Sequence, residues 1–292
     1  MAAGFGTRLR PLTLELPKPV VPVGDRPLLA HVAATCRSAG LAPLVANVHH
    51  EHEKIARIIR ELSLDIDVVV EPEIRGTAGG VAGARELLGP GPVLVWNGDI
   101  LTEAPVAELV RVAAERDAQV LAVSPRPAGE GTVGLDDDGA VVRLRGQVFG
   151  REARGGDYVG VMALGPGVVA ALPDRGCLFG DVALPDLAAG KRVWTIASAA
   201  AWSDLGDLKE YVAANFRWLD ERGAGAWQAE TARVAGAVRL ERCLVGDSAE
   251  VTGAGELREV IVWPGASVKA PLARAVVLSS GRVVPFEGPA EN

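Results

Sequence analysis

The chain has 292 residues, which is enough for about two domains and a large buried core. Its composition, 49% hydrophobic, 23% charged and only 4% aromatic, is that of a globular protein and excludes a disordered or collagen-like chain. The 30 Lys and Arg residues against 37 Asp and Glu residues give a net charge of -7, so no overall positive field attracts nucleic acid or anionic lipid. We therefore expect no nucleic-acid partner.

Cysteine spacing, hydropathy and the first residues indicate the compartment. The three cysteines lack Cys-x-x-Cys spacing and predict neither a disulfide framework nor a zinc site. The longest uncharged stretch, 158–173, is interrupted by glycines and is shorter than the ~20 apolar residues that span a bilayer. Residues 1–10 lack the basic-then-apolar order of a signal peptide. We expect a cytoplasmic protein with no membrane partner.

Helix and strand patterns alternate along the first 222 residues. Hydrophobic periodicity predicts helices over 27–40, 51–62, 77–88 and 106–116, and strands over 44–48, 66–70, 92–96 and 118–123. Such alternation is typical of a mainly parallel sheet covered by helices on both faces. We predict an α/β fold with a doubly wound, Rossmann-like sheet over residues 1–222.

A different pattern begins after residue 222. Apolar residues recur about six positions apart, as at Val245, Val251 and Leu257, with small residues between them. This period is typical of a left-handed parallel β-helix, although a few irregular strands would look similar because the register slips twice. We predict a short left-handed β-helix-like segment over 223–292 that serves stability or assembly, a homo-oligomer formed through it being one expectation.

The first residues form a glycine-containing loop that leads directly to arginine. Glycines let the backbone approach a ligand closely, and the guanidinium fork matches phosphate oxygens. The loop is not a Walker A loop, because no Gly-Lys-Ser/Thr ends it, and an ordinary glycine turn is the alternative. Lys18 follows between two prolines that restrict where its amine can point. The predicted phosphate-binding loop consists of Ala2, Ala3, Gly4, Gly6, Thr7 and Arg8.

These two segments resemble the sugar-1-phosphate nucleotidyltransferases, or nucleotide-sugar pyrophosphorylases. The signature of that family is Ala-Ala-Gly-x-Gly-Thr-Arg-Leu-x-Pro-Leu-Thr followed by Pro-Lys-Pro. The resemblance continues in Gly76–Gly80, which is similar to the family's base-contacting loop, in Trp96–Asp99, and in Trp202–Gly206 with Tyr211 and Asn215 after it. Asp99 also ends a predicted strand, where ligands of open α/β sheets bind.

The resemblance implies a role for each matching residue. Arg8 and Lys18 are implied as catalytic cations, and Asp99 and Asp204 as ligands of Mg²⁺. The implied nucleotide-binding residues are the loop Ala2 to Arg8 named above together with Glu71, Gly76, Thr77, Ala78 and Asn97, and the implied sugar-binding residues are Gly98, Tyr158, Gly160 and Asp181.

The implied reaction is Mg²⁺-dependent transfer of a nucleotidyl group from a nucleoside triphosphate to a sugar 1-phosphate. Glu71 with Gly-Thr-Ala-Gly is most similar to mannose-1-phosphate guanylyltransferases, so GTP and mannose 1-phosphate are the expected substrates. MurNAc 1-phosphate with UTP and a manno-heptose 1-phosphate with GTP are alternatives. A non-catalytic, regulatory member of the family is an alternative of another class.

Two features depart from the family's pattern. Arg143–Gly146 stands where the family commonly has Glu-Lys-Pro, so Arg145 is the candidate cation and no residue replaces the glutamate. The family also has an apolar strand before Ala-Ala-Gly, whereas this sequence reads Met1 directly before Ala2. We therefore expect the first strand of the sheet to be missing.

Three further groups of residues suggest chemistry but have simpler interpretations. His49, His50 and His52 indicate the start of a helix rather than a metal cluster. Asp136–Gly139 is better interpreted as a hairpin turn than as part of a calcium loop, which would need a later glutamate. Cys177 lacks a spaced histidine partner, so we expect no thiol nucleophile there.

Overall fold

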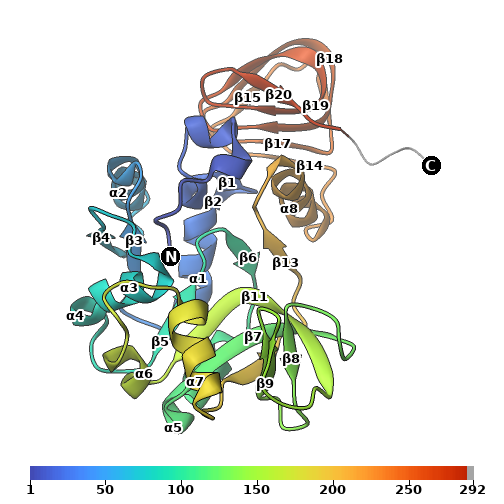
Figure 1. Cartoon of the computed structure of the whole chain (residues 1–292). Coiled ribbons are helices and arrows are strands. Elements are labelled where there is room, and N and C mark those ends of the chain that lie inside the picture. The colour runs from blue at the N-terminus through green and yellow to red at the C-terminus, as the bar shows by residue number, and fades with distance from the viewer. Residues whose placement is uncertain (288–292) are drawn as a thin grey trace. The chain divides into compact units, whose positions relative to one another are not determined.

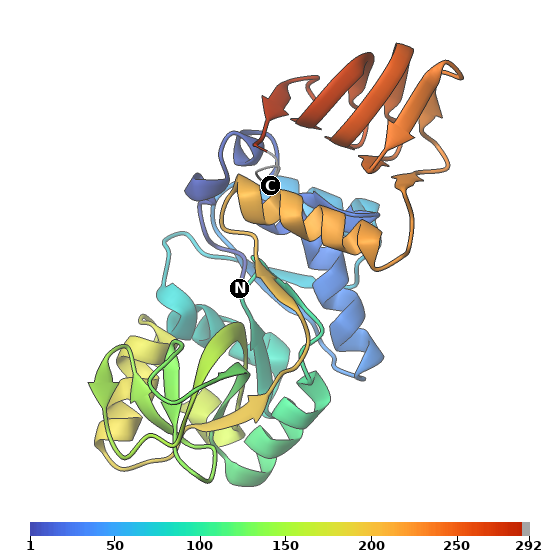
Figure 2. The same ribbon diagram turned by 90° about the vertical axis from the view of Figure 1, so that its right-hand side faces the viewer.

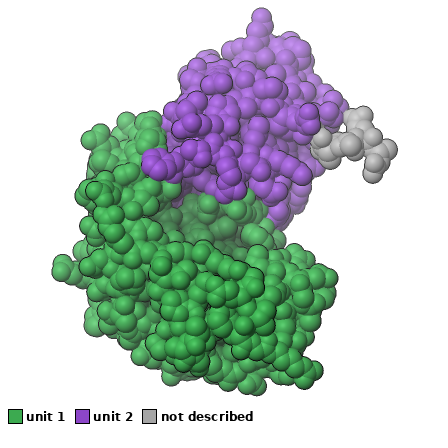
Figure 3. Space-filling model, in the orientation of Figure 1, with its two compact units in different colours: residues 1–4, 31–204 green, residues 5–30, 205–292 purple. Residues whose placement is uncertain are grey.

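The computed structural model describes residues 1–287 and divides into two compact units (Figure 3). Unit 1 contains residues 1–4 and 31–204, and unit 2 contains residues 5–30 together with those from 205 onward. Each unit is therefore assembled from segments that are distant in sequence. The predicted domain boundary between residues 222 and 223 remains a prediction.

Unit 1 alternates helices and strands, as expected from the periodicity (Figure 1). Its helices are α1 (Leu28–Ser38, whose first residues belong to unit 2), α2 (His52–Glu61), α3 (Gly76–Gly83), α4 (Arg85–Leu88), α5 (Val106–Arg116), α6 (Pro166–Ala170) and α7 (Leu184–Ala188), with a π-helical turn, η4 (Leu178–Ala183). Its strands are β3 (Val45–Val48), β4 (Asp67–Val70), β5 (Val93–Trp96), β6 (Ile100–Thr102), β7 (Gln119–Arg126), β8 (Val133–Leu135), β9 (Val141–Leu144), β10 (Gln147–Val148), β11 (Arg154–Leu164), β12 (Trp194–Ala197) and β13 (Trp202–Asp204). Every predicted element is present, except that the helix expected over 77–88 is divided into α3 and α4 at Ala84.

The main sheet of unit 1 is mixed rather than mainly parallel. Its order is β10-β9-β8-β11-β7-β12, and β5 also pairs with β11. The long strand β11 runs antiparallel to β5, β7 and β8, whereas β12 runs parallel to β7. The α/β class is confirmed, but the expected parallel sheet is wrong at its centre, because local periodicity does not show the direction of a long-range partner.

Alternate residues of the sheet face two separate cores. Val120 and Ala122 of β7 pack with Leu109 of α5 on one face. Leu121 and Val123 pack on the other face in a core that includes residues of α3, α6, η4 and α7. This period of two places helices on both faces, which is the doubly wound arrangement that the sequence predicted.

Strands β3 and β4 form a separate parallel pair. Met1 and Ala2 lie between this pair and β5: Ala2 forms a parallel bridge with Val48, and the Met1 nitrogen donates to the Trp96 carbonyl at 2.6 Å. These two residues therefore link β3 to β5. The expectation that this strand is missing remains a prediction.

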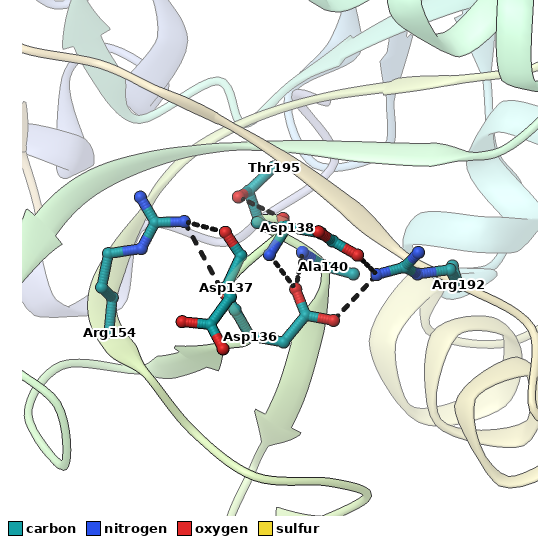
Figure 4. Close-up of polar contacts among 8 residues, drawn as sticks. Asp136, Asp137, Asp138, Ala140, Arg154, Arg192 and Thr195 are labelled. Atoms are coloured by element: carbon teal, nitrogen blue, oxygen red, sulfur yellow. Dashed lines mark hydrogen bonds and ion pairs between the residues drawn. The ribbon is translucent and has the colours of Figure 1, made fainter.

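The turn between β8 and β9 is the predicted hairpin, and its aspartates have basic partners (Figure 4). Arg192 donates to the carboxylates of Asp136 at 2.8 Å and Asp138 at 2.9 Å. Arg154 donates to the Asp137 carbonyl at 3.1 Å. The acidic run is thus an arginine-paired turn.

Unit 2 combines short N-terminal segments with the C-terminal part of the chain. Its elements are the 3-10 helices η1 (Thr7–Leu9), η2 (Leu12–Leu14) and η3 (Lys18–Val20), helix α8 (Leu208–Asp220), and strands β1 (Pro22–Val23), β2 (Arg26–Pro27), β14 (Ala226–Gln228), β15 (Arg233–Val234), β16 (Val238–Glu241), β17 (Cys243–Val245), β18 (Glu250–Val262), β19 (Ser267–Val277) and β20 (Val283–Pro285).

The strands from β14 to β19 stack as a parallel β-solenoid of about three coils (Figure 2). The register pairs Ala226 with Cys243 and Arg239 with Glu256, residues 17 positions apart. A coil of three complete hexapeptides would have 18 residues. The coil is one residue shorter than that, which explains why the six-residue pattern slips. The final strand β20 pairs antiparallel with β19 and ends the stack. The solenoid is confirmed, and its handedness remains a prediction.

Within residues 1–287, no helix combines the length and the apolar character needed to cross a lipid bilayer.

Candidate nucleotide and metal sites

The two predicted metal ligands meet at one end of a ribbon in unit 1. Strands β6 and β13 pair antiparallel, with Asp204 opposite Ile100, and Asp99 directly precedes Ile100. Residues opposite each other in such a ribbon have Cα atoms about 4.5–5.5 Å apart, so Asp99 and Asp204 are near neighbours. Two carboxylates suit a hard cation such as Mg²⁺. Within residues 1–287 no group of three or more His, Cys, Asp or Glu side chains is placed to hold a metal ion.

The turn that carries Asp99 packs directly on the first two residues. Gly98 donates its N–H to the Met1 carbonyl at 2.7 Å, and a Cβ at Gly98 would lie 2.4 Å from that oxygen. Asn97 donates its N–H to the Gly160 carbonyl at 2.9 Å. The first contact requires glycine at position 98, and the second joins a predicted nucleotide-binding residue, Asn97, to a predicted sugar-binding residue, Gly160.

Glu71 is buried, and both of its carboxylate oxygens accept hydrogen bonds. Oε1 accepts from the Asn47 side chain at 2.7 Å and Oε2 from the Arg75 N–H at 3.1 Å. Only 3% of Glu71 is exposed. Glu71 therefore supports the structure around the predicted base loop.

The start of α3 is clamped by residues 174–178. Gly76 has a φ of +78°, and a Cβ there would lie 2.4 Å from the Gly176 carbonyl oxygen. The same oxygen accepts from the Ala78 N–H at 2.9 Å, and Thr77 Oγ1 accepts from the Leu178 N–H at 2.8 Å. Gly76, Thr77 and Ala78 are thus fixed in place by a second segment of unit 1.

One predicted sugar-binding residue, Tyr158, lies beside an aromatic and sulfur-containing cluster in unit 1. The ring of Tyr158 meets Phe179 edge-on at a centroid distance of 4.9 Å. Burial raises the pKa of Tyr158, and the negative charge of Asp99 adds to this shift. Arg145 places Nη2 at 3.2 Å from Cys177 Sγ and its guanidinium 5.7 Å from the Phe179 ring.

Asp181 and Cys177 are linked through the backbone. Asp181 Oδ2 accepts from the Cys177 N–H at 2.6 Å, so this carboxylate helps to form the turn that begins η4. Burial raises the pKa of the Cys177 thiol, but hydrogen bonds from Gly180, Phe179 and Thr77, together with the charge of Arg145, outweigh it and leave the pKa below its ordinary value.

In unit 2, the glycine loop packs against Lys18. Gly6 has a φ of +62°, and a Cβ there would lie 3.0 Å from Thr13 Cγ2 and 3.2 Å from Lys18 Cβ. Thr13 Oγ1 donates to the Gly6 carbonyl at 2.8 Å. Lys18 itself is buried at 9% exposure. The structure thus brings together the two halves of the predicted phosphate-binding motif.

Arg8 extends over Gly206, the last residue of the Trp202–Gly206 motif. A Cβ at Gly206 would lie 2.8 Å from Arg8 Nη1. Arg8 and its neighbour Thr7 are both exposed, and Arg8 forms no ion pair within the described part of the chain. Its guanidinium can therefore bind an anion such as phosphate by donating hydrogen bonds to it.

Tyr211 and Asn215 of α8 hold the segment that follows Lys18. Tyr211 donates its hydroxyl to the Pro22 carbonyl at 2.7 Å, and Asn215 Oδ1 accepts from the Gly24 N–H at 2.9 Å. Trp263 of the solenoid donates Nε1 to the Tyr211 hydroxyl at 2.9 Å. Trp263 of the solenoid thus contacts α8, and α8 contacts Pro22 and Gly24, just after the Pro-Lys-Pro motif.

One central residue, Asn47, was not predicted from the sequence. It lies within β3, and its side chain bonds both Ala2 and Glu71. The signal that could have identified it is a buried amide inside an apolar strand.

Residues 1–221 match the model of the nucleotidyl transferase family. A probable mannose-1-phosphate guanylyltransferase 1 from Oryza sativa subsp. japonica is 30% identical over 269 residues, covering 84% of this chain and 73% of that protein. A mannose-1-phosphate guanyltransferase from Yarrowia lipolytica is 28% identical over 232 residues, so the match covers 75% of this chain and somewhat less than two thirds, 63%, of that relative.

Solved structures show the same fold. HddC from Yersinia pseudotuberculosis superposes with a TM-score of 0.62 at 20% identity, covering 74% of this chain and 96% of that one. An apo UDP-glucose pyrophosphorylase gives a TM-score of 0.59 at 17% identity, covering 76% of this chain and 97% of that one.

Proposed function

Because the chain belongs to the nucleotidyl transferase family, we propose that it makes a nucleotide sugar and pyrophosphate from a nucleoside triphosphate and a sugar 1-phosphate. GTP and mannose 1-phosphate, giving GDP-mannose, are the proposed substrates. The observation that carries this choice is the match to mannose-1-phosphate guanylyltransferases from a plant and a yeast.

The reaction needs positioning and charge neutralisation more than acid–base groups. A phosphate oxygen of the sugar 1-phosphate attacks the α-phosphorus of the triphosphate and forms the new P–O bond. The bond between the α-phosphorus and the bridging oxygen breaks, and its electron pair leaves with pyrophosphate. A phosphate monoester is already a nucleophile, so holding two anions in line supplies much of the catalysis.

The proposed phosphate-binding residues are Arg8 and Lys18. The exposed guanidinium of Arg8 suits the leaving phosphates, because its planar fork donates two parallel hydrogen bonds. Lys18 is restrained by the prolines beside it and by contact with Gly6, so its charge is assigned to the reacting phosphates. Both residues stabilise negative charge that develops as pyrophosphate leaves.

Asp99 and Asp204 are the proposed ligands of Mg²⁺. Their shared position at one end of the β6–β13 ribbon and their carboxylate chemistry fit a hard divalent cation. When bound, Mg²⁺ supplies positive charge to the triphosphate. Burial and the negative charge of Asp99 raise the pKa of Tyr158, so its phenol stays protonated at neutral pH.

The proposal is tested by following pyrophosphate release from each nucleoside triphosphate in turn with mannose 1-phosphate, MurNAc 1-phosphate and a manno-heptose 1-phosphate, with Mg²⁺ present. Turnover that is fastest with GTP and mannose 1-phosphate is expected. Faster turnover with another pair would correct the substrate, and nucleotide binding without turnover for every pair would favour a regulatory protein.

A further inference from the structure

Asn47 occupies a position that no catalytic assignment explains. It lies in β3 with 4% of its surface exposed, and both ends of its amide are used. Oδ1 accepts from the Ala2 N–H at 3.1 Å, and Nδ2 donates to Glu71 Oε1 at 2.7 Å. One side chain thus joins the glycine loop at the start of the chain to the carboxylate at the end of β4.

Glu71 carries the connection onward to the base loop. Its second oxygen, Oε2, accepts from the Arg75 N–H at 3.1 Å, and Arg75 directly precedes α3. The three hydrogen bonds form a continuous path from Ala2 through Asn47 and Glu71 to Arg75. Both ends of this path are main-chain N–H groups of predicted nucleotide-binding loops.

The backbone of α3 closes over this path. A Cβ at Gly80 would lie 2.6 Å from Asn47 Nδ2 and 2.9 Å from Glu71 Oε1. No side chain larger than hydrogen fits between the helix and the amide–carboxylate pair. This close packing explains why glycine occupies position 80, the last residue of the Gly-Thr-Ala-Gly-Gly sequence.

A buried carboxylate makes this arrangement sensitive to its partners. Hydrogen bonds to an ionised group are short and about twice as strong as neutral ones, whereas a buried charge that loses a donor pays a desolvation cost. Glu71 is held by two N–H donors, one of them from Asn47. A substitution of Asn47 should therefore shift the backbone at Arg75, through Glu71, as well as the backbone at Ala2.

We propose that Asn47 is a positioning residue of the nucleotide site, which acts through Glu71 to set the Ala2 loop and the start of α3 relative to each other. This inference rests on the proposed function and deepens it. Asn47 itself is too buried to touch a substrate, so its effect appears in nucleotide affinity rather than in base preference.

The test is the isosteric change Asn47→Asp, which keeps an oxygen for the Ala2 N–H and replaces the donor to Glu71 with a second carboxylate oxygen. We expect GTP binding, measured by titration calorimetry with Mg²⁺, to weaken roughly tenfold or more. The KM for GTP should rise more than kcat falls, and the ratio of GTP to UTP affinity should stay the same.

The matched control is Gln119→Glu in the same unit. Gln119 is also a buried amide, and its Nε2 donates to a carboxylate, Asp186 Oδ2, at 2.9 Å. The control carries the same change of chemistry away from both loops, so its melting temperature should fall while its GTP affinity stays within about twofold of the wild type.

A second variant, Glu71→Gln, keeps the proposal testable if Asn47→Asp does not fold. It removes a buried charge, which favours the folded state, but it turns an amide NH₂ toward the Arg75 N–H and leaves that buried donor unpaired, so its melting temperature should change little. GTP affinity should fall by roughly threefold to tenfold. Weaker binding at a nearly unchanged melting temperature separates positioning from a role in folding alone.

The outcomes for this inference and for the proposed function can be told apart. If the wild type binds GTP and the folded variants bind it equally well, the positioning role of Asn47 is refuted whatever the enzyme's turnover. A changed GTP to UTP ratio would also refute it, in favour of direct base contact by Glu71. Failure of the wild type to bind any nucleoside triphosphate would overturn both proposals.

Discussion

The two compact units fix their predicted phosphate-binding segments by different means. Unit 1 uses a buried carboxylate, Glu71, whose bonds to Asn47 and Arg75 connect two loops. Unit 2 uses neutral groups, in which Trp263 donates to Tyr211 and Tyr211 donates to the Pro22 carbonyl. A buried charge restrains the groups that donate hydrogen bonds to it, and removing one of these donors costs more free energy than removing a partner from a neutral hydrogen bond. The comparison predicts that unit 1 is the more sensitive to changes of charge.

Neutralising Asp99 should have the largest effect. Asp99→Asn keeps the size of the side chain but removes one of the two carboxylates at the end of the β6–β13 ribbon. We expect pyrophosphate release to fall roughly a hundredfold to a thousandfold with an unchanged melting temperature. The control is Asp137→Asn, which removes a carboxylate from the exposed hairpin turn and should leave the rate as it is. A rate for Asp99→Asn within a factor of two of the wild type would contradict the metal role.

Adding a methyl group at Gly80 tests the closed network of unit 1. In Gly80→Ala the new Cβ meets the Asn47 amide and the Glu71 carboxylate, and we expect the free energy of unfolding to fall by about 1–3 kcal/mol. In the matched variant Gly83→Ala, the Cβ meets only the far end of the Arg75 side chain at 3.2 Å, and better helix propensity should make it neutral or stabilising. Chemical denaturation measures both, and equal destabilisation of the two would mean that the network is not tightly packed.

Removing the Tyr211 hydroxyl tests the neutral hydrogen bonds that link Trp263, Tyr211 and Pro22 in unit 2. Tyr211→Phe leaves the Pro22 carbonyl and Trp263 Nε1 without this partner, at a cost of about 1–3 kcal/mol in the free energy of unfolding. Tyr158→Phe is the control, because the Tyr158 hydroxyl makes no hydrogen bond within residues 1–287, and its cost should be below about 0.5 kcal/mol. If Tyr211→Phe lowers the free energy of unfolding as little as Tyr158→Phe does, the two hydrogen bonds of the Tyr211 hydroxyl do not stabilise the segment that follows Lys18.

The smallest effect is expected at an ion pair near the surface of unit 1. Arg143 donates to Glu152 at 2.8 Å, and this bond, with one from the Gly129 N–H, lowers the pKa of Glu152 from its ordinary value of 4.5. A carboxyl with a lowered pKa stabilises the folded state above 4.5, and the contribution disappears as the pH falls through the folded pKa. The advantage of the wild type over Glu152→Gln should therefore be below about 1 kcal/mol at neutral pH and should shrink in acid.

Denaturation curves at neutral pH and at about pH 3.5 measure this difference. The control Glu103→Gln, at an exposed carboxylate that has no partner among residues 1–287, should give no difference at either pH. An advantage at Glu152 that grows in acid would contradict the ion pair.

Local patterns predicted much of this molecule, and long-range partners were beyond them. The elements from α1 to β7, apart from the short strand β6, follow from hydrophobic spacing, and Asp99 follows from its place after a strand. The direction of β11 does not, because its pairing with β5 depends on residues 65 to 71 positions away. Glu71 was predicted as a nucleotide ligand, but its burial and its link to Asn47 depend on a register between β3 and β4 that periodicity does not give. The 17-residue coil likewise results from turns between strands rather than from the apolar positions themselves.

The most direct test of the proposed activity is the reverse reaction. GDP-mannose and pyrophosphate are incubated with the purified chain and Mg²⁺, and the products are separated by anion-exchange chromatography. The account predicts GTP and mannose 1-phosphate in equal amounts, formed only when pyrophosphate is present. GDP-mannose that stays intact, or that is cleaved without pyrophosphate, would contradict it.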